Sequence, residues 1–210
     1  MNANQHVTLD QLAEKILAIP DDGARKLVAF VGAPASGKST VTEALATALR
    51  DHGRAAQVVT MDGFHLDNAI MDERGLRSGK GAPETFDVDG FSAMVARLKA
   101  GGDVVYPLFD RSLDKAIAGA GLIGADTDIA ILEGNYLLFD APVWRELSAQ
   151  WDVSVWLDTP LDVLRARLVQ RWLDHDHTLE EAEARADGND MANAARVAAH
   201  RLPADFVMAN

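Results

Sequence analysis

The sequence predicts an α/β fold in which helices flank a parallel sheet on both faces. Short apolar runs typical of buried strands alternate with longer segments whose apolar residues recur at helical spacing. Gly, Pro and Asp residues separate the two kinds of segment. Strands that alternate with helices form parallel sheets covered on both sides. The apolar runs are residues 27–31, 57–61, 104–106, 128–133, 153–158 and 205–208.

The helices are predicted from apolar spacing and from their boundary residues. They cover residues 7–19, 41–49, 89–99, 159–174, 179–186 and 189–199. Pro20 follows the leading helix, Gly101 follows the third, and Pro160 lies near the first turn of the fourth. We expect the last two helices to be joined at Asp187 and Gly188.

Two segments show neither kind of periodicity. Residues 62–87 are rich in Gly, Pro and charged side chains, which predicts a long loop. A loop of this length inside a compact domain is usually functional or mobile. Residues 117–126 are rich in Gly and Ala and predict a turn or a loose hairpin.

A glycine-rich segment lies between the first predicted strand and the second predicted helix. Its sequence, Gly-Ala-Pro-Ala-Ser-Gly-Lys-Ser-Thr, matches the P-loop pattern G-x-x-x-x-G-K-[ST]. The two glycines let backbone N–H groups turn inward around phosphates, and the helix N-terminus adds positive charge. The residues predicted to bind phosphate are Gly32, Ala35, Ser36, Gly37, Lys38, Ser39 and Thr40. A glycine-rich turn that binds nothing would leave this combination of residues and flanking elements unexplained.

The motif also predicts individual roles within the P-loop. Lys38 would bridge the β- and γ-phosphates of a nucleoside triphosphate, and the Ser39 hydroxyl would ligate Mg²⁺. With the alternating strands and helices, the motif predicts the three-layer fold of P-loop NTPases. We therefore expect ATP and Mg²⁺ as cofactors.

Composition limits the classes of partner. Hydrophobic residues make up 48% of the 210 residues and charged residues 25%, as in globular proteins. A formal net charge of −12 disfavours nucleic acid and anionic membranes as partners. The absence of cysteine excludes disulfides, thiolate metal sites and a cysteine nucleophile. No stretch has membrane-spanning character and the first residues do not resemble a signal peptide, so we expect one cytoplasmic domain over residues 1–210. Oligomeric state is not predicted, and a homodimer stays open.

Polar residues at strand ends are the candidates for chemistry. The carboxyl ends of parallel strands face the ligand crevice, so we expect Asp62, Tyr106 and Glu133 on one rim with the P-loop. Asp62 could accept a proton from an attacking hydroxyl or hold the metal, and Glu133 could ligate Mg²⁺ or contact substrate. A solvated turn residue and a turn-capping residue are the respective alternatives.

Three arginines indicate a helical lid over residues 167–188. Arg167 and Arg171 are four residues apart and share a helix face, and Arg185 lies on the following predicted helix. A lid of this kind would bring cations onto the transferring phosphate. Solvated helix residues are the alternative, above all for Arg167 and Arg185. We expect Arg171 to act in catalysis and Arg167 to bind phosphate.

Several motifs, in order, resemble a known kinase family. Residues 58–68, 73–76, 80–87 and 131–136 resemble the corresponding stretches of bacterial type I pantothenate kinase and, more loosely, of uridine kinase and phosphoribulokinase. The resemblance implies a P-loop kinase in which Asp62 is the base, Lys38 and Ser39 serve ATP and Mg²⁺, and Arg171 faces the γ-phosphate. It also implies that residues 200–203 lie over the adenine.

The resemblance weakens in the region that would select the acceptor. Pantothenate kinases carry Tyr-x-His after the third strand, whereas residues 106–112 read Tyr-Pro-Leu-Phe-Asp-Arg-Ser. This version, with Asn189 and Asn193, is more similar to a small bacterial branch named fructose transport system kinase or uridine kinase-like, which implies a sugar acceptor. Lys80 and Arg111 suit an anionic or hydroxyl-rich acceptor, or pair with nearby carboxylates.

His65 follows Asp62 by three residues and either lines the acceptor site or belongs to a surface loop.

Two functions compete at this point. The first is an ATP-dependent kinase acting on a hydroxyl of a sugar, nucleoside or pantothenate-like small molecule. The second is a nucleotide-dependent switch acting on a protein. The guanine-reading pattern Asn-Lys-x-Asp and the transporter signature Leu-Ser-Gly-Gly are both absent, which favours the kinase.

Overall fold

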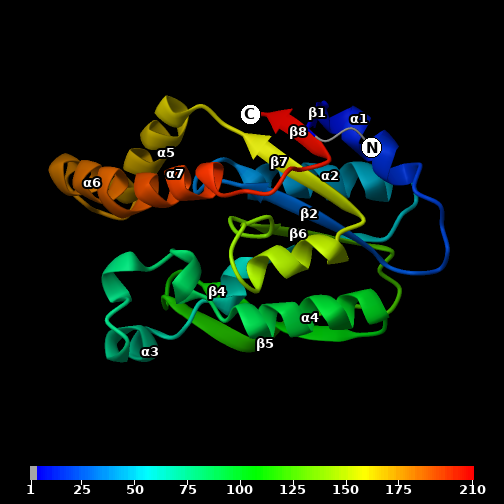
Figure 1. Cartoon of the computed structure of the whole chain (residues 1–210), viewed down its shortest axis with the longest axis horizontal. Coiled ribbons are helices and arrows are strands. Elements are labelled where there is room, and N and C mark those ends of the chain that lie inside the picture. The colour runs from blue at the N-terminus through cyan, green and yellow to red at the C-terminus, as the bar shows by residue number, and fades with distance from the viewer. Residues whose placement is uncertain (1–3) are drawn as a thin grey trace.

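Six parallel strands form the central sheet of the computed structural model, which describes residues 4–210 (Figure 1). Their spatial order is β1-β8-β7-β2-β6-β3. Their bounds are β1 Gln5–His6, β2 Lys26–Gly32, β3 Ala56–Thr60, β6 Ile129–Gly134, β7 Val153–Asp158 and β8 Phe206–Ala209. Every neighbouring pair is parallel, which confirms the predicted α/β class.

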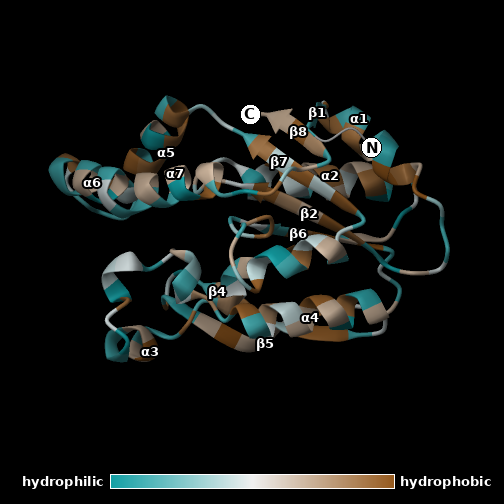
Figure 2. Ribbon diagram, viewed as in Figure 1, coloured by the Kyte–Doolittle hydropathy of each residue, from teal (hydrophilic) through white to brown (hydrophobic). Residues whose placement is uncertain are grey.

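Alternation along β2 explains how the two faces of the sheet are filled. Val28 and Phe30 point to one face and pack with helices α1 (Leu9–Leu17) and α2 (Lys38–Asp51). Leu27, Ala29 and Val31 point to the other face, towards α4 (Val88–Ala100). Because β2 is buried on both faces, its residues from Leu27 to Val31 are all hydrophobic, as Figure 2 shows for the centre of the molecule.

The helices agree with the predicted ranges at most positions. The remaining bounds are α3 Asn68–Glu73, α5 Leu161–Leu173, α6 Leu179–Arg185 and α7 Met191–Ala199. Helix α3 lies inside the segment that we predicted as a loop. The predicted junction at Asp187 and Gly188 is confirmed, and it takes the form of a π-helical turn, Ala186–Asp190, that runs from α6 into α7. Among residues 4–210, no helix combines the length and apolar character needed to cross a bilayer.

One predicted strand, residues 104–106, is a strand but belongs to a different sheet from the one expected. Strand β4 (Val104–Asp110) does not join the parallel sheet but pairs antiparallel with β5 (Lys115–Ile123) in a separate two-stranded ribbon. Residues 117–126, which we predicted as a turn or a loose hairpin, are therefore mostly part of the regular strand β5, and the turn lies before them. Most of β5 is exposed, so its residues lack the apolar alternation from which a strand is recognised.

Candidate active site

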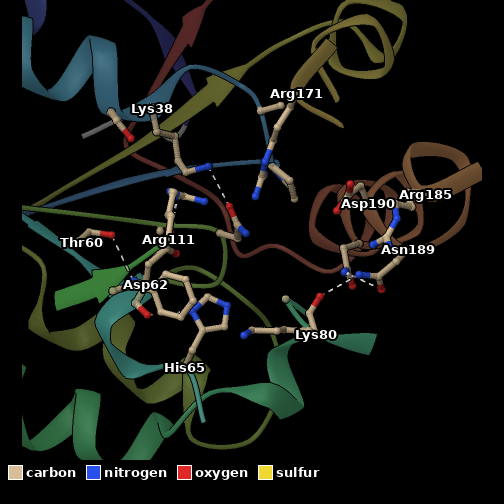
Figure 3. A pocket seen from close by; sticks show the side chains of 18 of the residues that line it. Lys38, Thr60, Asp62, His65, Lys80, Arg111, Arg171, Arg185, Asn189 and Asp190 are labelled. Atoms are coloured by element: carbon tan, nitrogen blue, oxygen red, sulfur yellow. Dashed lines mark hydrogen bonds and ion pairs between the residues drawn. The ribbon is translucent and has the colours of Figure 1, made fainter. Parts of the chain in front are cut away.

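A cavity of about 1120 Å³ opens beside the P-loop, at the carboxyl ends of β2, β3 and β6 (Figure 3). Its walls come from six segments far apart in the sequence. They are the P-loop, the 3₁₀ helix after β3, the loop around Lys80, the turn between β4 and β5, the end of β6, and the helices after β7. Lys38 and Arg171 converge on one side of the cavity, and Asp62, His65 and Lys80 lie on the other.

The P-loop geometry depends on its glycines. Gly37 has a φ of 90°, which favours glycine, and it immediately precedes α2. At Gly32 a Cβ atom would lie 2.7 Å from Ser36 Oγ and 3.2 Å from the main-chain oxygen of Leu157. Any side chain at this position would therefore require the loop to move. Glycine at these two positions therefore permits the tight path that the loop takes from β2 into α2.

Lys38 is held at the end of the cavity by three oxygen atoms. Its Nζ donates to the main-chain oxygens of Gly32 at 3.1 Å and Ala33 at 2.9 Å, and to Asn135 Oδ1 at 2.8 Å. Burial lowers the pKa of Lys38 to about 8. Asn135 was not predicted as a site residue. Asn135 directly follows the strand that ends with Glu133 and Gly134, and this position was the signal that could have identified it.

Ser39 and Glu133 form the place where a metal ion would fit. Ser39 Oγ donates to Glu133 Oε1 at 2.9 Å. Glu133 Oε2 is buried and has no hydrogen-bond partner among residues 4–210. Burial raises the pKa of Glu133. A hydroxyl and a carboxylate with an unsatisfied oxygen are hard donors of the kind that Mg²⁺ prefers, and a Mg²⁺ at a kinase site takes further ligands from the phosphates.

Asp62 lies in the 3₁₀ helix Met61–Phe64, directly after β3. Its Oδ2 accepts from Arg111 Nη2 at 2.9 Å. The ring Nδ1 of His65 lies 2.8 Å from the main-chain oxygen of Asp62 and donates to it. Burial lowers the pKa of His65, which favours the neutral ring. Asp62, His65 and Arg111, which we predicted as acceptor-site residues, thus meet on one side of the cavity.

His65 belongs to an aromatic floor. Its ring centroid lies 4.0 Å from that of Phe86 and 4.8 Å from that of Phe109. Lys80 Nζ lies 5.1 Å from the Phe109 centroid and donates to Asp114 Oδ1 at 2.6 Å and Asn68 Oδ1 at 2.9 Å. Both Lys80 and Arg111 therefore pair with carboxylates in this structure.

Arg171 and Arg185 approach the cavity from the helices after β7 and lie against the Trp172 ring. Their guanidinium carbons are 5.8 Å and 4.8 Å from its centroid. Trp172 Nε1 donates to Asp190 Oδ2 at 2.7 Å, and the π-helical turn supplies this aspartate. Within residues 4–210 neither arginine forms an ion pair, so both cations are available to an anion.

The cavity brings together most of the predicted site residues. It is lined by Ala35, Gly37, Lys38, Ser39, Thr40, Asp62, His65, Lys80, Arg111, Glu133 and Arg171. Tyr106 is a correction: it lies on the separate ribbon, is buried in the core, and does not line the cavity. Its ring packs so closely on Gly121 that a Cβ there would lie 2.5 Å from it.

Arg167 lies on the other side of the P-loop. Its Nη1 donates to the main-chain oxygen of Ser36 at 3.1 Å, and Asn210 Nδ2 donates to the same oxygen. Both residues line a second cavity, of about 310 Å³, with Gly37, Thr40 and Val41. Residues 200–203, which the resemblance places over the adenine, do not line this second cavity. They precede β8 and form hydrogen bonds with the segment after β6, whereas the chain after β8 reaches the P-loop.

Comparison with known proteins agrees with this geometry. Residues 27–182 match the Phosphoribulokinase / Uridine kinase family, which is well over half of the chain. The chain belongs to this family. It is a P-loop kinase, a phosphotransferase with a hydroxyl acceptor, and its family implies ATP as the phosphate donor.

Three of the proteins that match this chain have different kinase names. A solved structure from Silicibacter sp. TM1040, named "putative fructose transport system kinase", is 55% identical with a TM-score of 0.93, and the match covers 96% of this chain and 98% of that one. The Schizosaccharomyces pombe protein "Putative uridine kinase C227.14" is 31% identical over 95% of this chain and 89% of its own. The pantothenate kinase of Yersinia pestis is 30% identical over 72% of this chain, which spans about half of that protein's length, 52%.

Proposed function

We propose that this kinase transfers the γ-phosphate of ATP to a hydroxyl of a small sugar-like acceptor with the help of Mg²⁺. The observation that carries the proposal is the convergence of Lys38, the Ser39–Glu133 pair and Asp62 on one cavity. These groups can respectively bind phosphate, hold a metal ion and accept a proton. The printed name of the Silicibacter relative supports a sugar acceptor over a nucleoside or pantothenate.

The nucleotide occupies the P-loop side in this proposal. Lys38 binds the β- and γ-phosphates, and Arg171 faces the γ-phosphate. Ser39 and Glu133 would hold Mg²⁺, with Asp62 as a further candidate ligand, and a bound metal ion would neutralise phosphate charge. Arg167 and Asn210 contact the adenosine half of ATP, because they line the smaller cavity across the P-loop.

The acceptor occupies the side formed by Asp62 and the aromatic floor. Aromatic faces beside polar groups suit a polyol, whose C–H surface packs on the rings while its hydroxyls form hydrogen bonds. The acceptor oxygen bonds to the γ-phosphorus as the bond from that phosphorus to the bridging oxygen breaks, which releases ADP. The hydroxyl proton goes to the carboxylate of Asp62.

ADP release measured across sugars, nucleosides, pantothenate and related alcohols tests the proposal. We expect one class, the sugars or their close derivatives, to accelerate ADP release well above the rate without acceptor. Turnover with a nucleoside or pantothenate alone would replace the proposed sugar acceptor by that compound. ATP hydrolysis at a rate that no acceptor changes would favour the switch function.

We expect Arg171→Ala to lower kcat by about 10²- to 10³-fold while the KM for ATP rises only a few fold. An arginine that approaches the transferring phosphate contributes most when charge develops during transfer. Steady-state kinetics with varied ATP measure both constants. Arg145→Ala is the matched control, because Arg145 pairs with Asp140 outside the cavity. A change in KM alone would assign Arg171 to ground-state binding.

A further inference from the structure

The π-helical turn Ala186–Asp190 lies between α6 and α7, beside the cavity. The main-chain N–H of Met191 donates to the oxygen of Ala186, five residues earlier, so the turn contains one residue more than an α-helical turn. The extra residue rotates the residues after it by about 100° relative to a regular α-helix. Turns of this kind occur frequently at functional sites. Asn189 and Asp190, the last two residues of the turn, both line the cavity.

Asn189 connects this turn to the loop around Lys80, residues 77–85, on the acceptor side. Its Nδ2 donates to the main-chain oxygen of Lys80 at 2.8 Å (Figure 3). Because a carbonyl oxygen only accepts, this contact fixes which way the amide faces. The Oδ1 of Asn189 accepts from Nδ2 of the buried Asn193 at 3.2 Å. Asn189 is therefore held from α7 while it holds the loop.

The rest of the molecule holds the same loop independently of the turn. Tyr136, which follows β6, donates its hydroxyl proton to the main-chain oxygen of Gly81 at 2.6 Å. Asn68 of α3 accepts from Lys80 Nζ at 2.9 Å. The Asn189 bond therefore adds a contact from the helices after β7 to a loop that the sheet and α3 already position.

Asp190 connects the turn to the nucleotide side of the cavity. Its Oδ2 accepts from Trp172 Nε1 at 2.7 Å, and the Trp172 ring lies 5.8 Å from the guanidinium carbon of Arg171. Asp187, in the same turn, accepts two bonds from Arg165 of α5, at 2.6 and 2.8 Å. The turn is thus joined to α5 at two points, so a restraint on Arg171 and Trp172 reaches the turn through direct contacts.

We propose that the π-helical turn couples the two sides of the active site, and that Asn189 is the positioning residue through which a bound nucleotide orders the loop around Lys80. A phosphate that binds Arg171 restrains the adjacent Trp172, and Asp190 carries this restraint to Asn189. A loop ordered in this way costs less entropy to fix when the acceptor binds, so the nucleotide prepares the acceptor side. The inference rests on the proposed placement of the γ-phosphate beside Arg171.

Hydrogen–deuterium exchange of the whole chain, with and without Mg²⁺ and the non-hydrolysable analogue AMP-PNP, tests the coupling without an acceptor. We expect amide exchange in residues 77–85 to slow by about 5- to 50-fold when the analogue binds. Asn189→Ala should reduce this slowing to less than about twofold. Calorimetry should show that the variant binds the analogue within a few fold of the parent affinity, because Asn189 does not touch the nucleotide in this proposal.

Trp172→Phe tests the other end of the connection. It keeps an aromatic ring beside Arg171 but removes the N–H that donates to Asp190, so we expect the same loss of slowing in residues 77–85. The two substitutions lie in different elements, and thermal unfolding checks that each variant folds. If one variant does not fold, the other remains as the test.

Asn68→Ala is the matched control, because it removes a contact of Lys80 that comes from α3 and not from the π-helical turn. It should speed exchange in the loop without the analogue but preserve the slowing that the analogue causes. Slowing that persists in folded Asn189→Ala or Trp172→Phe would overturn the inference, as would its absence in the parent protein with the analogue bound. Failure of AMP-PNP to bind the parent protein would reject the proposed nucleotide site itself.

Discussion

Asp62→Asn is expected to lower kcat by about 10²- to 10⁴-fold and to leave ATP affinity near that of the parent protein. The change preserves the size of the side chain but removes the carboxylate that accepts the proton of the acceptor hydroxyl. Positioning of the phosphates by the P-loop remains, so part of the rate enhancement should survive. Calorimetry measures ATP affinity, and ADP release with the best acceptor measures kcat.

The control is Asp140→Asn, because Asp140 pairs with Arg145 away from the cavity. If Asp62 also ligates Mg²⁺, the loss will be larger, and added metal will restore part of the activity. Transfer within a few fold of the parent rate would exclude Asp62 as the base.

Lys38→Met is expected to lower kcat/KM by roughly 10²- to 10³-fold or more with little change in thermal stability. The substitution removes the charge that Lys38 Nζ places among the main-chain oxygens of Gly32 and Ala33. Because burial already disfavours the charged form of this lysine, a neutral side chain of similar length should be tolerated by the fold. Steady-state kinetics and thermal unfolding measure the two effects.

Lys115→Met provides the matched control, since Lys115 is an exposed residue of β5 outside the cavity. Near-normal turnover of the Lys38 variant would remove the P-loop from the mechanism. A large drop in the melting temperature would instead indicate a structural role.

The inner strands of the central sheet were predictable because they are apolar and buried. Strand β2 is apolar from Leu27 to Val31, and the P-loop follows it at once, so both its position and its direction could be inferred. The two-residue edge strand β1 is exposed and was not predicted. The ribbon of β4 and β5 was not predictable in the same way. Its outer residues are exposed, and Gly and Ala dominate β5, so the sequence carries no strong period. Because of this error, Tyr106 was predicted on the rim of the cavity, whereas it lies in the separate ribbon.

The residues of the candidate site likewise fall into those whose proximity could be predicted from the sequence and those whose proximity could not. Lys38, Ser39 and Glu133 lie at ends of central elements, and their proximity follows from the parallel sheet. Arg111 lies on the turn of the ribbon, and its contact with Asp62 depends on tertiary packing that no local pattern encodes. Asn135 directly follows β6 and could have been included for that reason, but its bond to Lys38, the first residue of α2, is known only from the fold.

Transfer of the radiolabelled γ-phosphate of ATP to an organic acceptor would distinguish a kinase from a nucleotide-dependent switch. The measurement follows the label from ATP into the acceptor, separated from inorganic phosphate, over the panel of sugars, nucleosides, pantothenate and related alcohols. We expect the label in the phosphorylated acceptor to equal the ADP formed, and we expect the Asp62→Asn and Lys38→Met variants to lose this product. Label found only in inorganic phosphate, at a rate that no acceptor changes, would exclude the kinase function.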